Sequence, residues 1–391
     1  HPKYYEGASD RLYRNNGDGT FTDATKAAGI NDSGGPFHGK GLGVVAADFD
    51  KDGWPDLYVA NDDTPNYLFY NKGDGTFAEI AVLAGCAYSI DGVAQGGMGV
   101  DVGDYNGDGF PDIFVTNFSH ETNTLYKNND DGTFTDVSYK ARLGEESYLR
   151  LGFGTGFFDY DNDGDLDIYV TNGEGFPNRL LENDGHGNFT DVAKHAGVDD
   201  LGRGHGVATA DIDNDGDLDI YVTNDGWNKL YLNNGDQTFM DIAESAGVVS
   251  KFNSTTCAFA DIDNDGYVDL YIGATDFVYG LNQLYRNNGD LTFSNITEQT
   301  GTAAAYSWAV AFCDYDNDGD LDLYIARGHI LDNIEVLNPG TRLSYRQSDQ
   351  LLENDDGGLA VDDQLLDPVV LIVYHDQFVC LVLRHDGEPK I

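Results

Sequence analysis

An all-β fold, a seven-bladed β-propeller of four-stranded blades, is predicted by three features of this sequence. A nine-residue pattern, Asp-x-Asp-x-Asp-Gly-x-x-Asp, recurs at intervals of 50 to 56 residues. A second pattern, Leu-Tyr-x-Asn-Asn-Gly-Asp-Gly-Thr-Phe, is interleaved with it. The chain also has 49 glycines and 24 tyrosines but two methionines, which fits a turn-rich β protein. Repeats of about fifty residues that each hold four short strands are typical of propeller blades.

The unit from Gly204 to Gly247 predicts the four strands of one blade. Small residues at 206–210 suit an innermost strand near a crowded axis, and residues 218–222 alternate in hydropathy as a second strand does. A third strand is expected at 229–233 and a fourth at 238–242. The Asn-Gly-Asp segment between them is hairpin-turn chemistry, because Asn and Gly tolerate positive φ.

The two ends of the chain are predicted to share a closing blade. The N-terminal part supplies only the third and fourth strands of a repeat, and the β-rich runs 368–374 and 378–384 offer two more. A ring closed in this way leaves no long exposed sheet edge. The prediction is a single domain, 1–391, with a shared blade from 1–28 and 367–391 and full blades at 39–82, 96–140, 151–195, 203–247, 253–300 and 305–361.

Each Asp-rich loop has the composition of a calcium site. In the first copy, Asp48, Asp50 and Asp52 alternate so that their carboxylates point inward, and the following glycine permits a sharp turn. The Trp54 carbonyl adds an oxygen and Asp56 closes the shell, as suits a cation that takes six to eight hard oxygen ligands. The residues at the same five positions of the other loops are Asp104, Asn106, Asp108, Phe110 and Asp112; Asp159, Asp161, Asp163, Asp165 and Asp167; Asp211, Asp213, Asp215, Asp217 and Asp219; Asp261, Asp263, Asp265, Tyr267 and Asp269; and Asp314, Asp316, Asp318, Asp320 and Asp322.

About six structural Ca²⁺ ions are therefore expected, because unpaired clusters of carboxylates repel one another. Magnesium fits less well, since it prefers few protein ligands and more water. The net charge of −46 points the same way and excludes nucleic acid and anionic membranes as partners. The alternative interpretation is an acidic surface that serves only solubility, but the acids recur in register.

Other features of the chain restrict its class less. The four cysteines form no CxxC pair; a Cys257–Cys313 disulfide is an alternative to the buried free thiols that we expect. No apolar run is long enough to span a membrane. The chain opens with His1 and has no basic-plus-apolar leader, so we expect either a removed signal peptide or a mature fragment.

The repeated loops and turns resemble FG-GAP/VCBS repeats, as in the integrin α-chain propeller. The chain is most similar to the ASPIC/UnbV type and the cartilage acidic protein group, on the strength of Gly328 to Asn333, Tyr345 to Gln347 and Leu351 to Asn354. The resemblance covers residues 10 to 358, and the chain departs from the family pattern after residue 358. It implies a secreted, cell-surface or periplasmic calcium-binding protein, often one implicated in adhesion.

The face opposite the metal loops is the predicted ligand face, because it carries the connections between blades and between the second and third strands. Its scarce basic and aromatic side chains suit an acidic or sugar ligand; the alternative is that they pair with neighbouring acids. The candidate residues are His38, Lys40, Arg150, Arg203, His205, Trp227, Trp308 and His329.

Three functions remain open from the sequence. The favoured one is a non-enzymatic binding or adhesion scaffold for an extracellular protein or glycan, because no catalytic set is evident. A structural subunit of a surface layer or filament, which would self-assemble, is the second. The third is a carbohydrate-active enzyme such as a polysaccharide lyase, which requires a cluster at the axis such as Arg150, Arg203 and His205.

Overall fold

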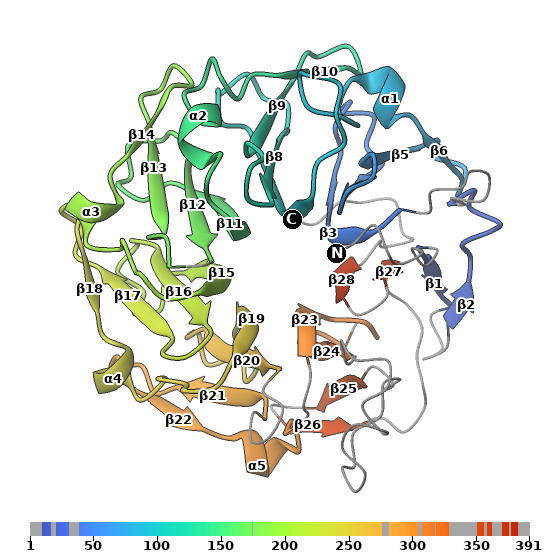
Figure 1. The fold of residues 1–391 in the computed structure, drawn as a ribbon. Helices are drawn as coiled ribbons and strands as arrows, with labels where there is room; N and C mark the ends of the chain where they lie inside the picture. Colours follow the sequence, from blue (N-terminus) through green and yellow to red (C-terminus); the bar gives the residue numbers. More distant parts are fainter. Residues whose placement is uncertain are drawn as a thin grey trace, which may run out of the picture.

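The structure, a computed structural model, is a ring of β-sheets that radiate from a central axis (Figure 1). It describes residues 10–16, 21–30, 39–173, 175–275, 281–303, 307–316, 318–327, 350–355, 358–361, 370–374 and 377–381. Six sheets have four antiparallel strands in simple up-and-down order, the first being β3-β4-β5-β6. Each sheet is one blade of a β-propeller.

The first strand of every blade faces the axis and is rich in glycine and other small residues. Gly154 shows why: an added Cβ would lie 2.5 Å from the His205 carbonyl oxygen of the next inner strand. Glycine therefore permits the close approach of inner strands around the axis. The inner strands are β3 (Gly41–Ala47), β7 (Gly97–Gly103), β11 (Gly152–Phe158), β15 (Gly204–Ala210), β19 (Ser254–Ala260) and β23 (Ser307–Cys313).

The second strand of each blade is buried on both faces, since each blade packs between two neighbours. In β16 all six residues are buried, including Tyr221, whose hydroxyl donates to the Val248 carbonyl at 2.9 Å. The sequence predicted that apolar and polar residues would alternate in this strand, and the structure buries the polar positions as well as the apolar ones. The second strands are β4 (Asp56–Asn61), β8 (Asp112–Asn117), β12 (Asp167–Asn172), β16 (Asp219–Asn224), β20 (Asp269–Ala274) and β24 (Asp322–Arg327).

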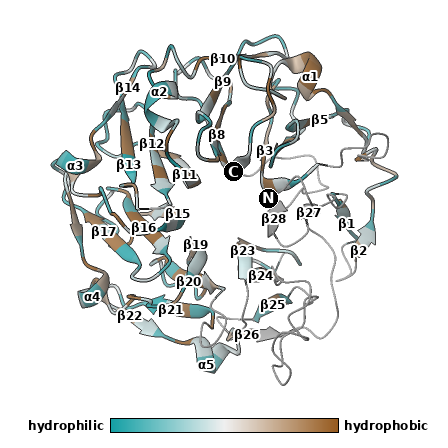
Figure 2. Cartoon of the chain, viewed as in Figure 1, coloured by the Kyte–Doolittle hydropathy of each residue, from teal (hydrophilic) through white to brown (hydrophobic). Residues whose placement is uncertain are grey.

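The third and fourth strands form a hairpin at the outside of each blade. Figure 2 shows hydrophobic residues within strands such as β13 and β17, whereas most connecting loops are hydrophilic. The third strands are β5 (Tyr67–Asn71), β9 (Thr124–Asn128), β13 (Arg179–Asn183), β17 (Lys229–Asn233), β21 (Gln283–Asn287) and β25 (Gln350–Asp355). The outer strands are β6 (Phe77–Glu79), β10 (Phe134–Asp136), β14 (Phe189–Asp191), β18 (Phe239–Asp241), β22 (Phe293–Asn295) and β26 (Gly358–Val361).

A single helical turn follows the outer strand of blades one to five. In α4, Gly247 ends the turn with φ of 80°, a left-handed cap that glycine adopts without strain. The helices are α1 (Ala81–Ala84), α2 (Gly144–Ser147), α3 (Ala193–Ala196), α4 (Ala243–Ala246) and α5 (Thr297–Thr300).

The prediction of seven blades is wrong, because the described chain forms six four-stranded sheets. The ends form two separate two-stranded sheets, β1 (Tyr13–Asn15) with β2 (Phe21–Asp23) and β27 (Val370–Tyr374) with β28 (Gln377–Leu381). The expected strands at both ends exist, but no ladder joins the two hairpins within the described residues. The physical reason is that neither end contains the Asp-rich loop, whose last aspartate connects the backbones of three strands in a complete blade.

The N-terminal hairpin packs between the sixth and first blades. Asn15 Nδ2 donates to the Tyr315 carbonyl of blade six at 2.9 Å. On its other side Leu12 belongs to the hydrophobic cluster of blade one, together with Val59 and Phe69. Strand β28 contacts both β3 and β23 near the axis (Figure 1). The hairpins thus occupy the space between the two ends of the row of six blades.

Candidate metal centre and the opposite face

The Asp-rich loops join the first and second strands of each blade, so all six lie at one end of the blades. The fourth loop shows how the sequence folds locally. Asp211 accepts hydrogen bonds from the N–H groups of Asp215 at 3.1 Å and Gly216 at 3.0 Å, and Asp215 accepts one from Asp217 N–H at 2.9 Å. Gly216 has φ of 96° and Asn214 has φ of 61°, conformations that favour Gly and Asn. The turn therefore directs its carboxylates toward a common point.

In five of the six loops, three carboxylates bring oxygens within 4.8 Å of one another. Oxygens of Asp161, Asp213 and Asp263 are buried and have no hydrogen-bond partner. Burial, followed by the charge of Asp215, raises the pKa of Asp213. Buried, unpartnered and mutually repelling carboxylate oxygens fit a hard divalent cation such as Ca²⁺. The convergent groups are Asp48, Asp50 and Asp52; Asp159, Asp161 and Asp167; Asp211, Asp213 and Asp219; Asp261, Asp263 and Asp265; and Asp314, Asp316 and Asp322.

The last aspartate of each loop also holds the blade together. Asp219 is 1% exposed and accepts hydrogen bonds from Ile212 N–H at 3.0 Å and Asn233 N–H at 2.7 Å. It therefore connects the end of the inner strand to the end of the third strand. Burial raises its pKa to about 7. The pKa is raised to about 7, with burial as the largest cause, for the equivalent residues Asp56, Asp112, Asp167, Asp269 and Asp322.

Side chains that were not predicted from the sequence connect neighbouring loops around the ring. Asn162 Nδ2 donates to Asp217 at 2.5 Å, and Asn264 Nδ2 donates to Asp320 at 2.8 Å, in each case to the loop of the next blade. Lys51 holds the equivalent position in the first loop, and its Nζ lies 4.0 Å from the centroid of the Phe110 ring in the second loop. The recurrence of Asn at this loop position was the available signal. These contacts couple the metal loops to one another.

The second loop differs from the others. Lys127 donates to Asp108 at 2.5 Å, and Asn106 Nδ2 donates to Asp112 at 2.9 Å. Burial acts to raise the pKa of Asp108, but the hydrogen bonds from Lys127 and Phe110 N–H and the ammonium charge hold this pKa below its ordinary value. The carboxylates of this loop do not form a group of three like those of the other five.

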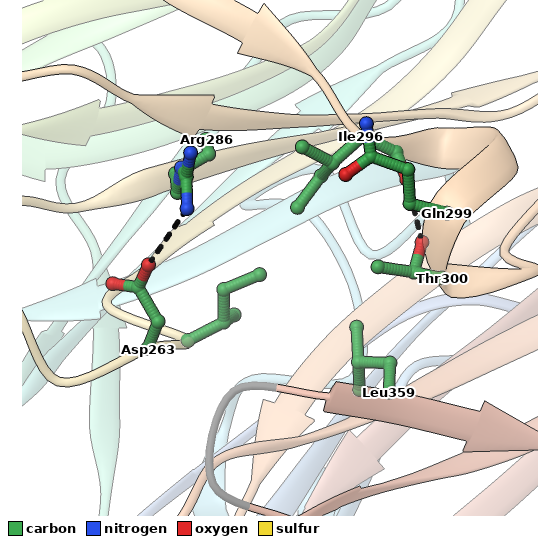
Figure 3. A pocket seen from close by; sticks show the side chains of 7 residues that line it. Asp263, Arg286, Ile296, Gln299, Thr300 and Leu359 are labelled. Atoms are coloured by element: carbon green, nitrogen blue, oxygen red, sulfur yellow. Dashed lines mark hydrogen bonds and ion pairs between the residues drawn. The ribbon is translucent and has the colours of Figure 1, made fainter.

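A cavity of about 170 Å³ lies beside the fifth loop, lined by residues of blades five and six. Figure 3 shows side chains that line it. Arg286 on β21 points toward Asp263 of the loop, with 3.8 Å between Nη1 and Oδ2. Leu359 of β26 and Thr300 of α5 line the same cavity. The Arg286 side chain is half exposed, so its ion pair is screened by water.

The predicted ligand-face residues that the structure describes all lie at the end of the blades opposite the metal loops. Arg203 pairs with Asp225 at 3.2 Å, which supports the alternative interpretation for this residue. Arg150 lies 6.0 Å from the Phe176 ring and donates to the Glu146 carbonyl at 3.1 Å. Lys40 directly precedes β3. His38 and His329 lie outside the described residues.

Of the remaining predicted ligand-face residues, two are on inner strands near the axis and one is on the outer surface. His205 and Trp308 are the second residues of β15 and β23, both half-buried. The His205 ring packs against Phe153 in a tilted arrangement, with 4.9 Å between centroids and 48° between planes, and burial lowers the pKa of His205. Trp227 is 59% exposed, and Lys251 Nζ lies 4.6 Å from its ring. The sequence did not single out Lys251, which reaches this site from the next blade connection.

Exposed large apolar side chains gather on the same face. Eight of those described occupy loops between the second and third strands or connections between blades on this face. The others lie elsewhere: Val82 and Leu83 on α1, Tyr139 just after β10, Met240 on β18 and Trp54 in a metal loop. The members on the opposite face are Ile90, Val93, Phe118, Tyr148, Leu149, Leu201, Trp227 and Leu281. The described part of the chain is therefore acidic at one end of the blades and partly apolar at the other.

Cys86, Cys257 and Cys313 are free thiols, as expected, so the alternative Cys257–Cys313 disulfide is not formed. Within the described residues no helix has the length and hydrophobicity needed to cross a membrane.

These features define a class: a repeat β-propeller with an Asp-rich loop in every four-stranded blade. A family model for the FG-GAP-like repeat matches residues 5–59, 48–115, 104–170, 159–222, 211–272 and 273–325. The chain belongs to this family, which confirms the resemblance seen in the sequence.

Curated relatives are similar to part of this chain, and a solved structure has a similar fold. Cartilage acidic protein 1 of Xenopus tropicalis is 32% identical over 134 residues, and the human protein is 33% identical over 119. These segments cover 34% and 30% of this chain, but only 20% and 17% of the relatives. An Agrocybe aegerita lectin that recognises non-reducing terminal N-acetylglucosamine superposes with a TM-score of 0.55 at 18% identity, over 92% of this chain and 90% of the lectin. An exotype rhamnogalacturonan lyase is more distant, with a TM-score of 0.44 at 15% identity, over 84% of this chain and 58% of the lyase.

Proposed function

We propose that this chain is an extracellular, calcium-stabilised propeller that serves as a non-enzymatic binding scaffold for a protein or glycan partner. The observation that carries the proposal is the division between its two faces. Convergent carboxylates fill one end of the blades, and exposed aromatic, aliphatic and basic side chains gather at the other.

Calcium acts in this proposal as a structural ion. Each loop links the first and second strands of a blade, and Asn side chains link one loop to the next. A cation between the carboxylates removes their repulsion and stabilises this network. The residues that would hold it are the convergent aspartates, with the carbonyl of the seventh loop residue as a further oxygen.

The opposite face supplies the binding surface in this proposal. An exposed Trp227 with Lys251 over its ring offers a flat apolar surface beside a positive charge. Aromatic faces of this kind stack on sugar rings and also anchor protein interfaces. The lectin fold and the name of the cartilage relatives are compatible with either partner.

Two experiments test the two halves of the proposal. Thermal unfolding with EDTA should show a large fall in Tm that added calcium reverses; an unchanged Tm would remove the calcium part. For the binding part, the protein is incubated with a panel of polysaccharides in calcium and analysed by gel filtration. Co-elution that is lost in Trp227→Ala but kept in Met240→Ala, an exposed site on the outer strand β18, supports the scaffold. Shortened polymer would overturn the non-enzymatic assignment.

A further inference from the structure

The third residue of the Leu-Tyr-x-Asn pattern stands beside the metal loop of its own blade. Its side chain differs in charge from blade to blade. Lys127 in blade two and Arg286 in blade five face Asp108 and Asp263. Glu182 in blade three is negative; burial, followed by the charge of Asp161, raises its pKa. The position in blade four is Leu232, which has no charge.

In the second loop a lysine ammonium contacts one of the carboxylates that would hold a cation. Lys127 Nζ lies 2.5 Å from Asp108 Oδ2 and 3.1 Å from the carbonyl oxygen of Asn128. These are a carboxylate and a carbonyl, the kinds of oxygen that bind calcium. An ammonium group at hydrogen-bond distance neutralises the carboxylate directly.

The amide at position 106 also removes a negative charge from the second loop. In loops three, four and five the equivalent residues are Asp161, Asp213 and Asp263, each with a buried oxygen that lacks a hydrogen-bond partner. Asn106 instead donates its Nδ2 to Asp112 Oδ2 at 2.9 Å. The second loop is thus satisfied by its own donors.

The charge of the two kinds of loop differs by two units. Only the four loop positions whose side chains would hold the cation are counted here. In the fourth loop these are Asp211, Asp213, Asp215 and Asp219, with a charge of −4, beside the neutral Leu232. The second loop has three carboxylates beside one lysine, a charge of −2. Calcium affinity follows the number of charged ligands in such loops.

We infer that Lys127 replaces calcium in the second loop, so that the chain binds five calcium ions and blade two keeps its loop without metal. The inference rests on the proposed calcium binding and adds which loops take part. The fifth loop belongs to the binding set, because three of its carboxylates converge and Arg286 is at 3.8 Å and half exposed.

Native mass spectrometry of the full chain at saturating calcium counts the bound ions. Wild type should hold five, the double variant Asn106→Asp/Lys127→Glu six, and Leu232→Lys, which places an ammonium beside the fourth loop, four. Lys72→Gln, an exposed lysine in a hairpin turn of blade one, is the matched control and should leave five. Six ions in wild type, or an unchanged count in the double variant, would overturn the role of Lys127 while leaving calcium binding intact. No bound calcium at all would instead overturn the proposed function.

Hydrogen exchange tests the same idea without counting ions, and so covers a variant that fails to fold. Removal of calcium with EDTA should speed exchange at Gly164 and Gly216, whose amides bond to Asp159 and Asp211. Exchange at Gly109, whose amide bonds to Asp104 at 2.6 Å, should change less than twofold in wild type. Equal acceleration of all three amides would refute the inference.

Discussion

The asparagine that ends each third strand should be essential for joining neighbouring blades. Asn233 is 4% exposed; its Nδ2 donates to the Tyr160 carbonyl of the preceding blade at 2.9 Å and to the Leu218 carbonyl at 3.3 Å. Its Oδ1 accepts from Gly235 N–H at 3.1 Å. Asn233→Ala removes three hydrogen bonds at once and leaves the carbonyl of the buried Tyr160 without its side-chain donor.

The expected loss of stability follows from these contacts. A net hydrogen bond contributes about 1 kcal/mol, and a buried group left unsatisfied costs about 1–3 kcal/mol. We expect Asn233→Ala to lower the free energy of unfolding by about 2–4 kcal/mol. The neighbouring Asn234 is exposed and its side chain bonds only to Thr238 within the turn, so Asn234→Ala should cost about 0.5 kcal/mol or less.

Urea unfolding in a fixed calcium concentration, followed by circular dichroism, measures both variants. The transition midpoints can be compared where the dependence of the unfolding free energy on urea concentration is the same in the variants as in wild type. Equal midpoints for Asn233→Ala and Asn234→Ala would refute the reasoning, because the inter-blade bonds would then contribute nothing beyond an ordinary turn contact.

Three further predictions concern other parts of the ring. Burial raises the pKa of Asp101 to about 6. The folded state therefore binds the proton of this carboxyl group more tightly than the unfolded state does. The resulting stabilisation is full below about pH 4 and is lost as pH rises through about 6. Asp101→Asn should therefore be more stable than wild type at pH 8 by up to about 3 kcal/mol and gain nothing at pH 4, as chemical denaturation at the two pH values will show. Gly154→Ala places a Cβ 2.5 Å from the His205 carbonyl oxygen and should lower the free energy of unfolding by about 1–3 kcal/mol. An unchanged Tm would mean that the neighbouring inner strands move apart to admit the methyl group without loss of stability. The Arg179 side chain is 3% exposed and pairs with two carboxylates, so Arg179→Ala should lower the free energy of unfolding by about 3 kcal/mol. For Arg203→Ala, at an exposed ion pair, the loss should be about 1 kcal/mol or less. Equal losses of stability in thermal unfolding would contradict the role of burial.

Much of a single blade was predictable from local sequence. The strands expected at 229–233 and near 238–242 are β17 and β18, and the Asp-rich loop folds as its Asp and Gly spacing indicates. These features depend on contacts within a few residues, such as the bonds from Gly216 to Asp211. The full burial of β16 was not predicted, because the covering side chains come from the next blades.

The metal loops and the opposite face were predictable to different degrees. Loop positions follow from spacing, whereas the contacts that distinguish one loop from another join distant residues. Lys127 stands nineteen residues after Asp108, and Asn128 Nδ2 reaches the Phe49 carbonyl across 79 residues. On the opposite face, Lys251 meets Trp227 only because a blade connection returns beside an inter-strand loop.

The sequence by itself determined the repeat, the strand pattern of a blade and the carboxylates of six loops, since each is a matter of periodicity and short-range turn chemistry. Only the tertiary structure decided that there are six blades and that five loops converge. Both depend on which strands and charges meet across the ring. The end segments lack the aspartate that would connect their hairpins into a blade, and the second loop has an ammonium beside it. Such pairings depend on distances in space that sequence spacing does not encode.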